Sequence, residues 1–208
     1  MIIDPNTFER FSAVLTGVIV PRPIAFVSTM APDGVVNLAP YSFFNAVSYS
    51  HVMFSSSRHV GNKSKDTLRN IEETGQFVIN IVVDPIADAM NATAAEYPEG
   101  VDEFEIAGLT HAPSQIVKPP RVAESPVNIE CELDQVIQIG SGDHEHGLVI
   151  GKILLMHVRD DVIDGHRIDQ AKLMATGRMA GNMYCRTNDR FEMVRPVYDP
   201  EKSAIVTR

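Results

Sequence analysis

The alternation of apolar and polar residues predicts several long β-strands in this chain. The segment 127–139 (VNIECELDQVIQI) alternates in the manner of a half-buried strand. The segment 147–158 (GLVIGKILLMHV) predicts another strand, and its internal Gly151 indicates a bulge or a bend. The run 77–83 (FVINIVV) is apolar on both faces, which is typical of a strand buried within a sheet or barrel.

The N-terminal third predicts shorter strands. The segments 24–29 (IAFVST) and 35–38 are extended in character and flank the turn residues 31–34 (APDG). Strand, Asp-Gly turn and strand in that order predict a β-hairpin. The segment 51–55 (HVMFS) predicts a further strand.

Two segments predict helices. In 63–74, Asp66 is a candidate cap, Leu68 and Ile71 share one face, and Gly75 follows the last helical residue. The segment 85–96 predicts a second helix. The stretch 97–125 is rich in proline, glycine and acidic residues, so we expect an irregular excursion rather than part of the core.

Many strands, few helices and no regular βαβ alternation favour a mainly β (α+β) fold, a β-barrel with a few peripheral helices. A doubly wound nucleotide-binding sheet is disfavoured, because neither G-x-G-x-x-G nor a Walker motif is present. The 208 residues suit one domain over 1–208, with the excursion at about 97–125 and a C-terminal tail after about 185.

The composition limits the classes of ligand and the cellular location that we expect for this protein. The formal net charge of −9 argues against nucleic-acid binding, but it leaves room for a small phosphorylated ligand held by a few local donors. Cys131 and Cys185 are far apart in sequence and are expected to be reduced thiols. No apolar run approaches the ~20 residues of a membrane span and no signal-peptide pattern is visible, so we expect no membrane association and a cytoplasmic location.

Three polar segments are candidates for ligand binding. In 37–45 (NLAPYSFFN), Pro40 is expected to interrupt strand pairing and free backbone groups for a ligand; the alternative is a surface turn before a core-anchoring Phe pair. In 54–57 (FSSS), three serines offer hydroxyl and N–H groups, and the alternative is a solvated loop. In 62–67 (NKSKDT), a helix N-terminus with two lysines suits a phosphate, and the alternative is an ordinary capped helix with solvated lysines.

Two later segments are less specific. In 142–151, His144 and His146 fall on one side of an extended chain, with Asp143 and Glu145 beside them. An isolated H-x-H is weak evidence, so we predict no metal site; one histidine contacting a polar ligand and a plain loop stay open.

In 175–184 (ATGRMAGNMY), two glycines permit close approach and Arg178 and Tyr184 can face a cofactor. A glycine-containing connection with a surface arginine is the alternative. Hydrolase chemistry has little support, because no G-x-S-x-G is present and neither cysteine lies in a nucleophile motif.

Taken in order, these segments resemble the flavin reductase-like, FMN-binding split-barrel family over about residues 10–185. The segments that carry the resemblance are 22–29 (RPIAFVST), 37–45, 52–55 (VMFS), 65–71 (KDTLRNI), 75–80 (GQFVIN), His146 to Gly151, and 177–181 (GRMAG). The resemblance implies a Greek-key split barrel that forms a homodimer, with FMN near the dimer interface.

The resemblance also implies which residues bind the cofactor. The flavin ring and ribityl chain are expected to contact Asn37, Leu38, Ala39, Pro40, Tyr41, Ser42, Ser55, Ser56 and Ser57. The phosphate is expected near Lys65, Asp66 and Thr67, with Arg22. His146 is expected near the docking position of the nicotinamide, and the adjacent His144 leaves open which of the two histidines serves.

The leading functional hypothesis is an NAD(P)H-dependent flavin reductase that passes hydride from nicotinamide to flavin. The runner-up is a flavoredoxin-like, FMN-bearing electron-transfer protein reduced by a protein partner, followed by a flavin-binding protein without turnover and, more distantly, a metal-dependent β-barrel enzyme. An electron-acceptor protein or a monooxygenase is a possible partner. Because flavin carries the redox chemistry itself, the lack of an obvious catalytic acid, base or nucleophile agrees with the first three.

Overall fold

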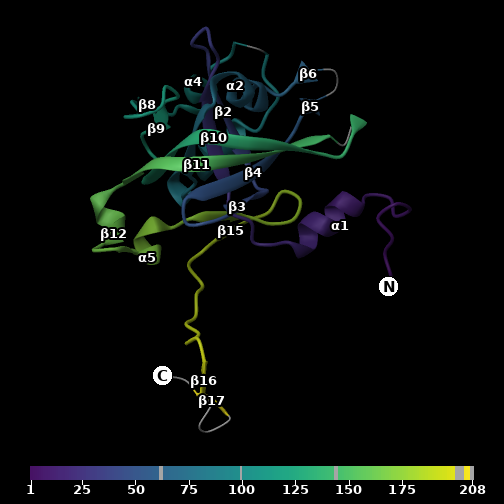
Figure 1. Cartoon of the computed structure of the whole chain (residues 1–208), viewed down its shortest axis with the longest axis vertical. Helices are drawn as coiled ribbons and strands as arrows, with labels where there is room; N and C mark the ends of the chain where they lie inside the picture. The colour runs from purple at the N-terminus through teal and green to yellow at the C-terminus, as the bar shows by residue number, and fades with distance from the viewer. Residues whose placement is uncertain (61–62, 99, 143–144, 200–203, 207–208) are drawn as a thin grey trace.

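A computed structural model describes residues 1–60, 63–98, 100–142, 145–199 and 204–206 of the chain. Its centre is a seven-stranded antiparallel sheet with the strand order β2-β1-β7-β10-β11-β4-β3 (Figure 1). The strands are β1 (Ala25–Met30), β2 (Val36–Tyr41), β3 (Phe44–Ala46), β4 (His51–Ser57), β7 (Gln76–Ile81), β10 (Val127–Ile139) and β11 (His146–Val158). The mainly β architecture with peripheral helices is confirmed.

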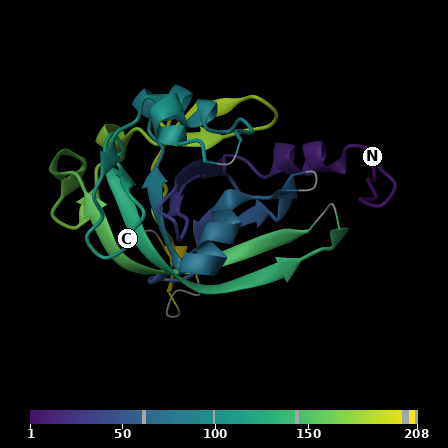
Figure 2. The same ribbon diagram turned by 90° about the horizontal axis from the view of Figure 1, so that it is seen from above.

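The sheet curls until its first and last parts face each other. Figure 2 shows the long β10–β11 hairpin curving around the remaining strands. Tyr41 of β2 packs on Phe54 of β4 with 4.9 Å between ring centroids, although β2 and β4 lie toward opposite ends of the hydrogen-bonding order. The interior of the curl is the first core, which includes Phe54, Phe77 and Ile79.

Helices and small strand pairs surround this sheet. The helices are α1 (Phe11–Val18), α2 (Asp66–Thr74), α3 (Ala87–Ala92), α4 (Glu103–Ala107) and α5 (Gln170–Leu173), with short 3₁₀ turns at Asp84–Ile86 and Asp160–Val162. The small pairs are β5 (His59–Val60) with β6 (Lys63–Ser64), β8 (His111–Ala112) with β9 (Arg121–Val122), β12 (Ile163–Asp164) with β13 (Arg167–Ile168), β14 (Thr176–Arg178) with β15 (Tyr184–Arg186), and β16 (Val197–Asp199) with β17 (Ala204–Val206).

Successive residues of β1 are buried on opposite faces, as strand geometry requires. Ala25 and Val27 belong to the first core, whereas Phe26, together with Ile24 just before the strand, belongs to a second core beneath α3 and α4. The central strands are therefore covered on both faces, which explains why the consecutive residues Phe77, Val78 and Ile79 of β7 are all fully buried.

Gly151 marks an irregular point in the sheet, as expected. The pairing of β10 with β11 shifts between Leu133 and Gln135, directly opposite Gly151 and Ile150. Close packing gives a further reason for glycine, because an added Cβ would lie 2.2 Å from Cζ of Phe77.

Both predicted helices are shorter than expected. The pairing of β5 with β6 takes up residues 63–64, so α2 begins at Asp66 and Lys65 occupies the cap position. Asp66 is the first helical residue and not the cap, and no side chain among the described residues caps the helix. The second helix consists of the 3₁₀ turn and α3, which ends at Ala92.

Two strand predictions also need correction. The strand predicted over 77–83 ends at Ile81, because Val83 instead forms an isolated bridge with Ala175. Pro40 does not interrupt pairing: it lies within β2 opposite Phe26. Because β2 is an edge strand, the missing N–H of proline costs no ladder hydrogen bond.

The excursion over 97–125 is not outside the core, contrary to expectation. Phe104 and Val122 from this segment are fully buried in the second core. Polar side chains of the sheet anchor it: Ser28 donates to the Pro120 carbonyl, and the Asn80 side-chain oxygen accepts from the Val122 N–H at 2.9 Å. A polar, proline-rich composition hid these few anchoring contacts.

After β15 the chain leaves the body as an extended arm that ends in the β16–β17 pair (Figure 1). The arm exposes large apolar side chains, among them Phe191 and Met193, which are 84% and 81% exposed. Within the described residues, no helix is both long enough and apolar enough to cross a membrane.

Candidate functional site

A cavity of about 640 Å³ lies between β2 and the N-terminus of α2. The structure brings together here seven residues that were predicted as cofactor ligands from two separate segments: Asn37, Ala39, Pro40, Tyr41, Lys65, Asp66 and Thr67. The remaining wall comes from Arg69, from residues 93–98 and from Glu103. The size of the cavity lies within the range of small-molecule and cofactor sites.

A buried polar network fixes the start of α2 against β2. The Asn37 side-chain amide donates to the Thr67 hydroxyl at 2.8 Å, and the Asn70 amide donates to the Thr29 hydroxyl at 3.1 Å. Asn37 and Thr67 are almost fully buried. These contacts explain why the 37–42 and 65–67 segments, distant in sequence, form one wall of the cavity.

The N-terminus of α2 presents a positive end to the cavity. Lys65 stands at the cap position, and no described side chain caps the first turn. The first N–H groups of a helix have no intrahelical partner and carry a partial positive charge. Asp66 forms an ion pair with Arg69 at 2.7 Å, which partly neutralises that acidic residue.

Tyr41 lines the cavity at the end of β2. Its side chain is 7% exposed, and its hydroxyl is hydrogen bonded with Thr67 and Ser56. Burial raises the pKa of Tyr41 above its usual value, so the phenol stays neutral. The Lys65 ammonium lies 6.0 Å from the centroid of this ring.

Leu38 contacts the core rather than the cavity. Its side chain is fully buried in the second core, and its backbone N–H donates to Oε2 of Glu103 at 2.9 Å. Any contribution of Leu38 to ligand binding is therefore indirect, through the position of Glu103.

Glu103 is the site residue that sequence reasoning missed. It comes from α4, inside the segment predicted to be irregular, and its side chain is 8% exposed. Burial raises the pKa of its carboxyl, and the nearby Asp102 and Asp66 add to the effect, whereas the Leu38 N–H opposes it. No local sequence signal marks this residue, because its partner is the outward-facing backbone of an edge strand.

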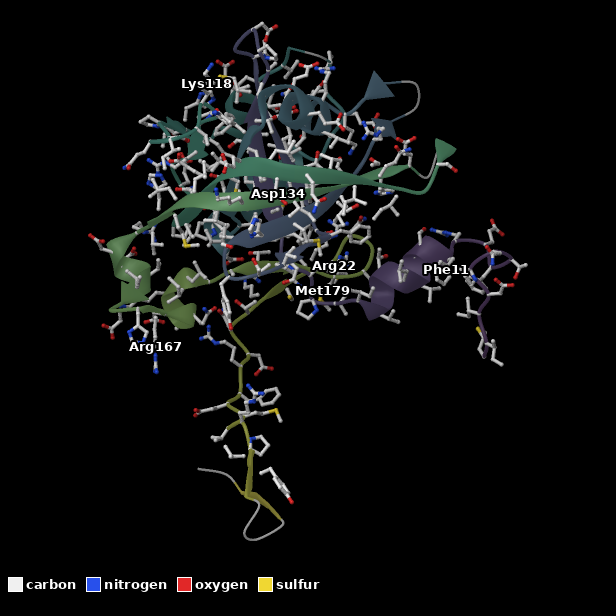
Figure 3. All side chains as sticks on the ribbon, in the orientation of Figure 1. Phe11, Arg22, Lys118, Asp134, Arg167 and Met179 are labelled. Carbon is white, nitrogen blue, oxygen red and sulfur yellow. The ribbon has the colours of Figure 1, made fainter. Side chains whose placement is uncertain are left out.

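Arg22 and Ser42 line a second, smaller pocket of about 370 Å³, which meets the first cavity at Pro40 and Ala94. The Arg22 guanidinium is almost fully buried and donates to the carbonyls of Thr16 and Ile19, both at 2.7 Å. It also donates to the Ser42 hydroxyl at 3.3 Å and to the Met179 carbonyl at 3.1 Å. Figure 3 labels Arg22 and Met179, which come from opposite ends of the chain. Arg22 therefore stands apart from the cavity that Lys65 lines.

The serines of β4 and His146 of β11 lie on neighbouring strands. Ser57 is paired with His146, and the Ser55 hydroxyl lies 3.3 Å from Nδ1 of His146. The buried Ser56 hydroxyl donates to the Ser57 carbonyl. In the described structure, none of these four residues lines either of the two pockets above.

His144 and Asp143, considered above as metal candidates, lie outside the described residues, as does Asn62. Among the residues that the structure does describe, no three metal-ligating side chains gather at one point.

Comparison with known proteins identifies the family and the fold. Residues 18–179 match the family model of the flavin reductase like domain. The structure of nitrilotriacetate monooxygenase component B from Bacillus cereus is 35% identical, with a TM-score of 0.88, over 93% of this chain and 98% of that one. That of 2-nitrobenzoate 2-nitroreductase NbaA from Pseudomonas fluorescens is 30% identical, with a TM-score of 0.86, over 96% and 98%.

A protein of Shewanella frigidimarina, described as a flavin reductase with a split-barrel domain, is 20% identical with a TM-score of 0.81, over 94% of this chain and 99% of that one. This likeness shows the fold, and the predicted split barrel is confirmed. With its family model matched over most of the chain, the protein belongs to the flavin reductase-like family.

Proposed function

We propose that this protein is an FMN-binding oxidoreductase that acts as an NAD(P)H-dependent flavin reductase. The observation that carries the proposal is the N-terminus of α2, which has no side-chain cap among the described residues and lines the 640 Å³ cavity together with Lys65 and Thr67. The family is one of flavin proteins, and the B. cereus and P. fluorescens relatives are described as a monooxygenase component and a nitroreductase.

The residues of the cavity fit a flavin mononucleotide. The α2 N-terminus and the Lys65 ammonium supply donors for a phosphate, which is the group that distinguishes FMN from riboflavin. The apolar faces of Ala39, Pro40 and Tyr41 continue the same wall and suit a flat ring. The carboxyl group of Glu103 lines this cavity as well, and it suits hydroxyl or N–H groups rather than the phosphate.

When bound, FMN supplies the electron-transfer chemistry of the reaction. The protein's own residues then orient it and exclude water. The Asn37–Thr67 hydrogen bond holds β2 and the start of α2 together, and the neutral, buried Tyr41 lines the cavity beside them. In this proposal Ser55, Ser56 and Ser57 bind the flavin from β4, and His146 hydrogen bonds the nicotinamide. Arg22 and Ser42 line the adjoining pocket and not the proposed flavin cavity, so their place as flavin ligands rests on the resemblance alone.

We also propose that the protein acts as a homodimer. The C-terminal arm supports this, because its exposed Phe191 and Met193 gain nothing from water and would be buried by a second copy. A monooxygenase is the proposed recipient of the reduced flavin, by analogy with the B. cereus component.

Flavin binding tests the cofactor. Purified protein titrated with FMN is expected to quench flavin fluorescence, and Lys65→Ala combined with Thr67→Ala is expected to weaken the affinity about tenfold or more. Lys118→Ala, at an exposed position, is the matched control and should bind like the wild type. Unchanged FMN affinity in a folded double variant would contradict the placement of the phosphate.

Steady-state oxidation of NADH and NADPH with FMN separates the reductase from its alternatives. Turnover with either nucleotide supports the reductase. Tight FMN binding without such turnover would favour the flavoredoxin-like electron carrier or a binding protein without turnover, and reduction of the bound FMN by a protein donor would distinguish those two.

A further inference from the structure

The second pocket contains two guanidinium groups, those of Arg22 and Arg178. The two residues form an antiparallel β-bridge. The Arg22 backbone N–H donates to the Arg178 carbonyl at 2.9 Å, and the Arg178 backbone N–H donates to the Arg22 carbonyl at 2.8 Å. Residues paired in this way project their side chains to the same side. Both arginines line the pocket, and in the described part of the chain neither forms an ion pair.

This pairing is unfavourable for the protein alone. Like charges directly opposite each other across strands are destabilising. The Arg22 side chain is 6% exposed, so water screens its charge poorly. Burial lowers the pKa of Arg22, and the nearby positive charge of Arg178 lowers it further. An anion between them would remove this repulsion.

The two arginines are held in place but keep unused donors. Arg22 uses four of its five N–H groups on neutral oxygens: one at Nε, two at Nη1 and one at Nη2. Within the described residues, Arg178 donates only to the Tyr184 hydroxyl and the Gly181 carbonyl, and its guanidinium lies 4.6 Å from the centroid of the Tyr184 ring. Tyr184 is fixed in turn by donating to Asn91 at 3.0 Å. Arg178 is therefore a preorganised donor with N–H groups to spare.

The rest of the pocket suits an apolar body attached to the anion. Ile24, Phe43 and Met90 line it, and the Phe43 ring is 42% exposed with the Arg22 guanidinium 5.9 Å from its centroid. The volume of about 370 Å³ accommodates one ring and not a whole dinucleotide. The pocket meets the proposed flavin cavity at Pro40 and Ala94, so a molecule bound here would lie next to the flavin.

We infer that Arg22 and Arg178 form an anion subsite that binds the carboxylate or phosphate of the small molecule that exchanges electrons with the flavin. The identity of that molecule as a redox partner rests on the proposed function. The anion site itself does not, because it can be tested with redox-inactive probes.

Calorimetric titration of the purified, FMN-saturated protein tests the subsite. The probes are benzoate, the neutral benzamide of the same shape, and inorganic pyrophosphate. The variant Arg178→Gln removes the charge, while its amide can still donate to neighbouring oxygens. The control is Arg167→Gln, at an exposed arginine on β13 (Figure 3).

Wild type is expected to bind benzoate or pyrophosphate at least tenfold more tightly than benzamide, and Arg178→Gln is expected to lose about tenfold of that anion affinity. Arg178→Lys keeps the charge but not the forked donors, so its anion affinity should lie between those of the wild type and Arg178→Gln. FMN affinity should change by less than about twofold in all three variants. If benzoate binds more tightly than pyrophosphate, the natural ligand is a carboxylic acid. If pyrophosphate binds more tightly than benzoate, the natural ligand is the nicotinamide nucleotide.

Three results would overturn the inference. Equal anion affinity in Arg178→Gln and Arg167→Gln would show that the pair is not a binding site. Binding of neither benzoate nor pyrophosphate more tightly than benzamide would show that charge is not recognised. A parallel loss of FMN affinity in Arg178→Gln would assign the pair to the flavin itself. If wild type binds no FMN, the proposed function fails, while the probe titrations of the flavin-free protein still decide the anion site.

Discussion

Glu130 is expected to be a major source of stability, because it is a fully buried carboxylate with four hydrogen-bond donors. Its Oε1 accepts from the Gln115 N–H at 2.7 Å and lies 2.6 Å from Nε2 of His157. Its Oε2 accepts from the Ile116 and Val117 N–H groups at 2.7 and 3.0 Å. Burial alone would raise the pKa of Glu130, but these donors outweigh burial and lower the pKa to about 2 from 4.5.

The magnitude follows from that shift. A difference of about 2.5 pKa units corresponds to about 3 kcal/mol of folding free energy. Since the folded-state pKa lies below the unfolded value, the contribution is complete above about pH 4.5 and is lost as the pH falls toward 2; about 2 kcal/mol is gone by pH 3. Glu130→Gln replaces one acceptor oxygen by an NH₂ group facing N–H donors, which should cost about 3 kcal/mol at pH 7.

Urea unfolding of Glu130→Gln at pH 7 and pH 3 measures this effect. The matched control is Glu132→Gln on the same strand, where the exposed carboxylate pairs with Lys152 at 2.9 Å and should contribute less than about 1 kcal/mol. The difference in unfolding free energy between wild type and Glu130→Gln should become about 2 kcal/mol smaller when the pH is lowered from 7 to 3. A gap below about 1 kcal/mol at pH 7, or one that does not change with pH, would refute the reasoning.

Further predictions concern packing, thiol reactivity, the nicotinamide side and assembly. Gly151→Ala forces a Cβ into the Phe77 ring and should cost about 1–3 kcal/mol in urea unfolding, and Phe77→Leu should recover part of that loss; additive effects would contradict the clash. Burial, with the Glu130 charge adding to it, raises the pKa of the Cys131 thiol to about 12, so a thiol reagent at pH 8 should label Cys185 alone until the protein is denatured. His146→Ala should raise KM for NAD(P)H or slow flavin reduction by up to about tenfold while FMN affinity is kept; an effect of His144→Ala instead would identify the other histidine. Light scattering should give twice the 22.9 kDa chain mass, and a monomer at all micromolar concentrations would exclude the proposed homodimer.

Much of the sheet was predictable from the sequence because its strands obey simple periodicity. The strand β10 spans the predicted residues 127–139, and β11 begins one residue before the predicted segment. Both are long strands in which the alternation of side chains is maintained over many residues, so local pattern and final structure agree. The irregularity at Gly151 was predictable for the same reason, because a glycine inside such a strand often marks a bulge, a bend or a close approach.

The errors arose where tertiary contacts override local preference. The segment that carries Glu103 looks unstructured because it is polar and proline-rich, and what orders it is distant: buried Asn80, Ser28 and Glu130 bind its backbone from the sheet. The start of α2 shifted because strand pairing at residues 63–64 competes with the helix. Neither effect leaves a trace in the local sequence.

The candidate site also has a part that the sequence predicts and a part that it does not. Asn37 and Thr67 were predicted as ligand residues from separate segments, and the structure joins them through one buried hydrogen bond. Arg22 was expected beside Lys65 but lies in the adjoining pocket, because its guanidinium binds carbonyls from α1 and from the Met179 loop. Which acceptors a buried arginine finds depends on chain segments that sequence order does not bring together.

The central claim, that the α2 N-terminus binds the phosphate of FMN, is tested most directly by comparing FMN with riboflavin. The two differ only in the phosphate, so fluorescence titration of the flavin-free protein isolates its contribution. We expect FMN to bind at least about tenfold more tightly than riboflavin, because charge-assisted hydrogen bonds to the phosphate are each worth about 1.5–3 kcal/mol. Equal affinities for the two flavins, or no quenching by either, would contradict the account.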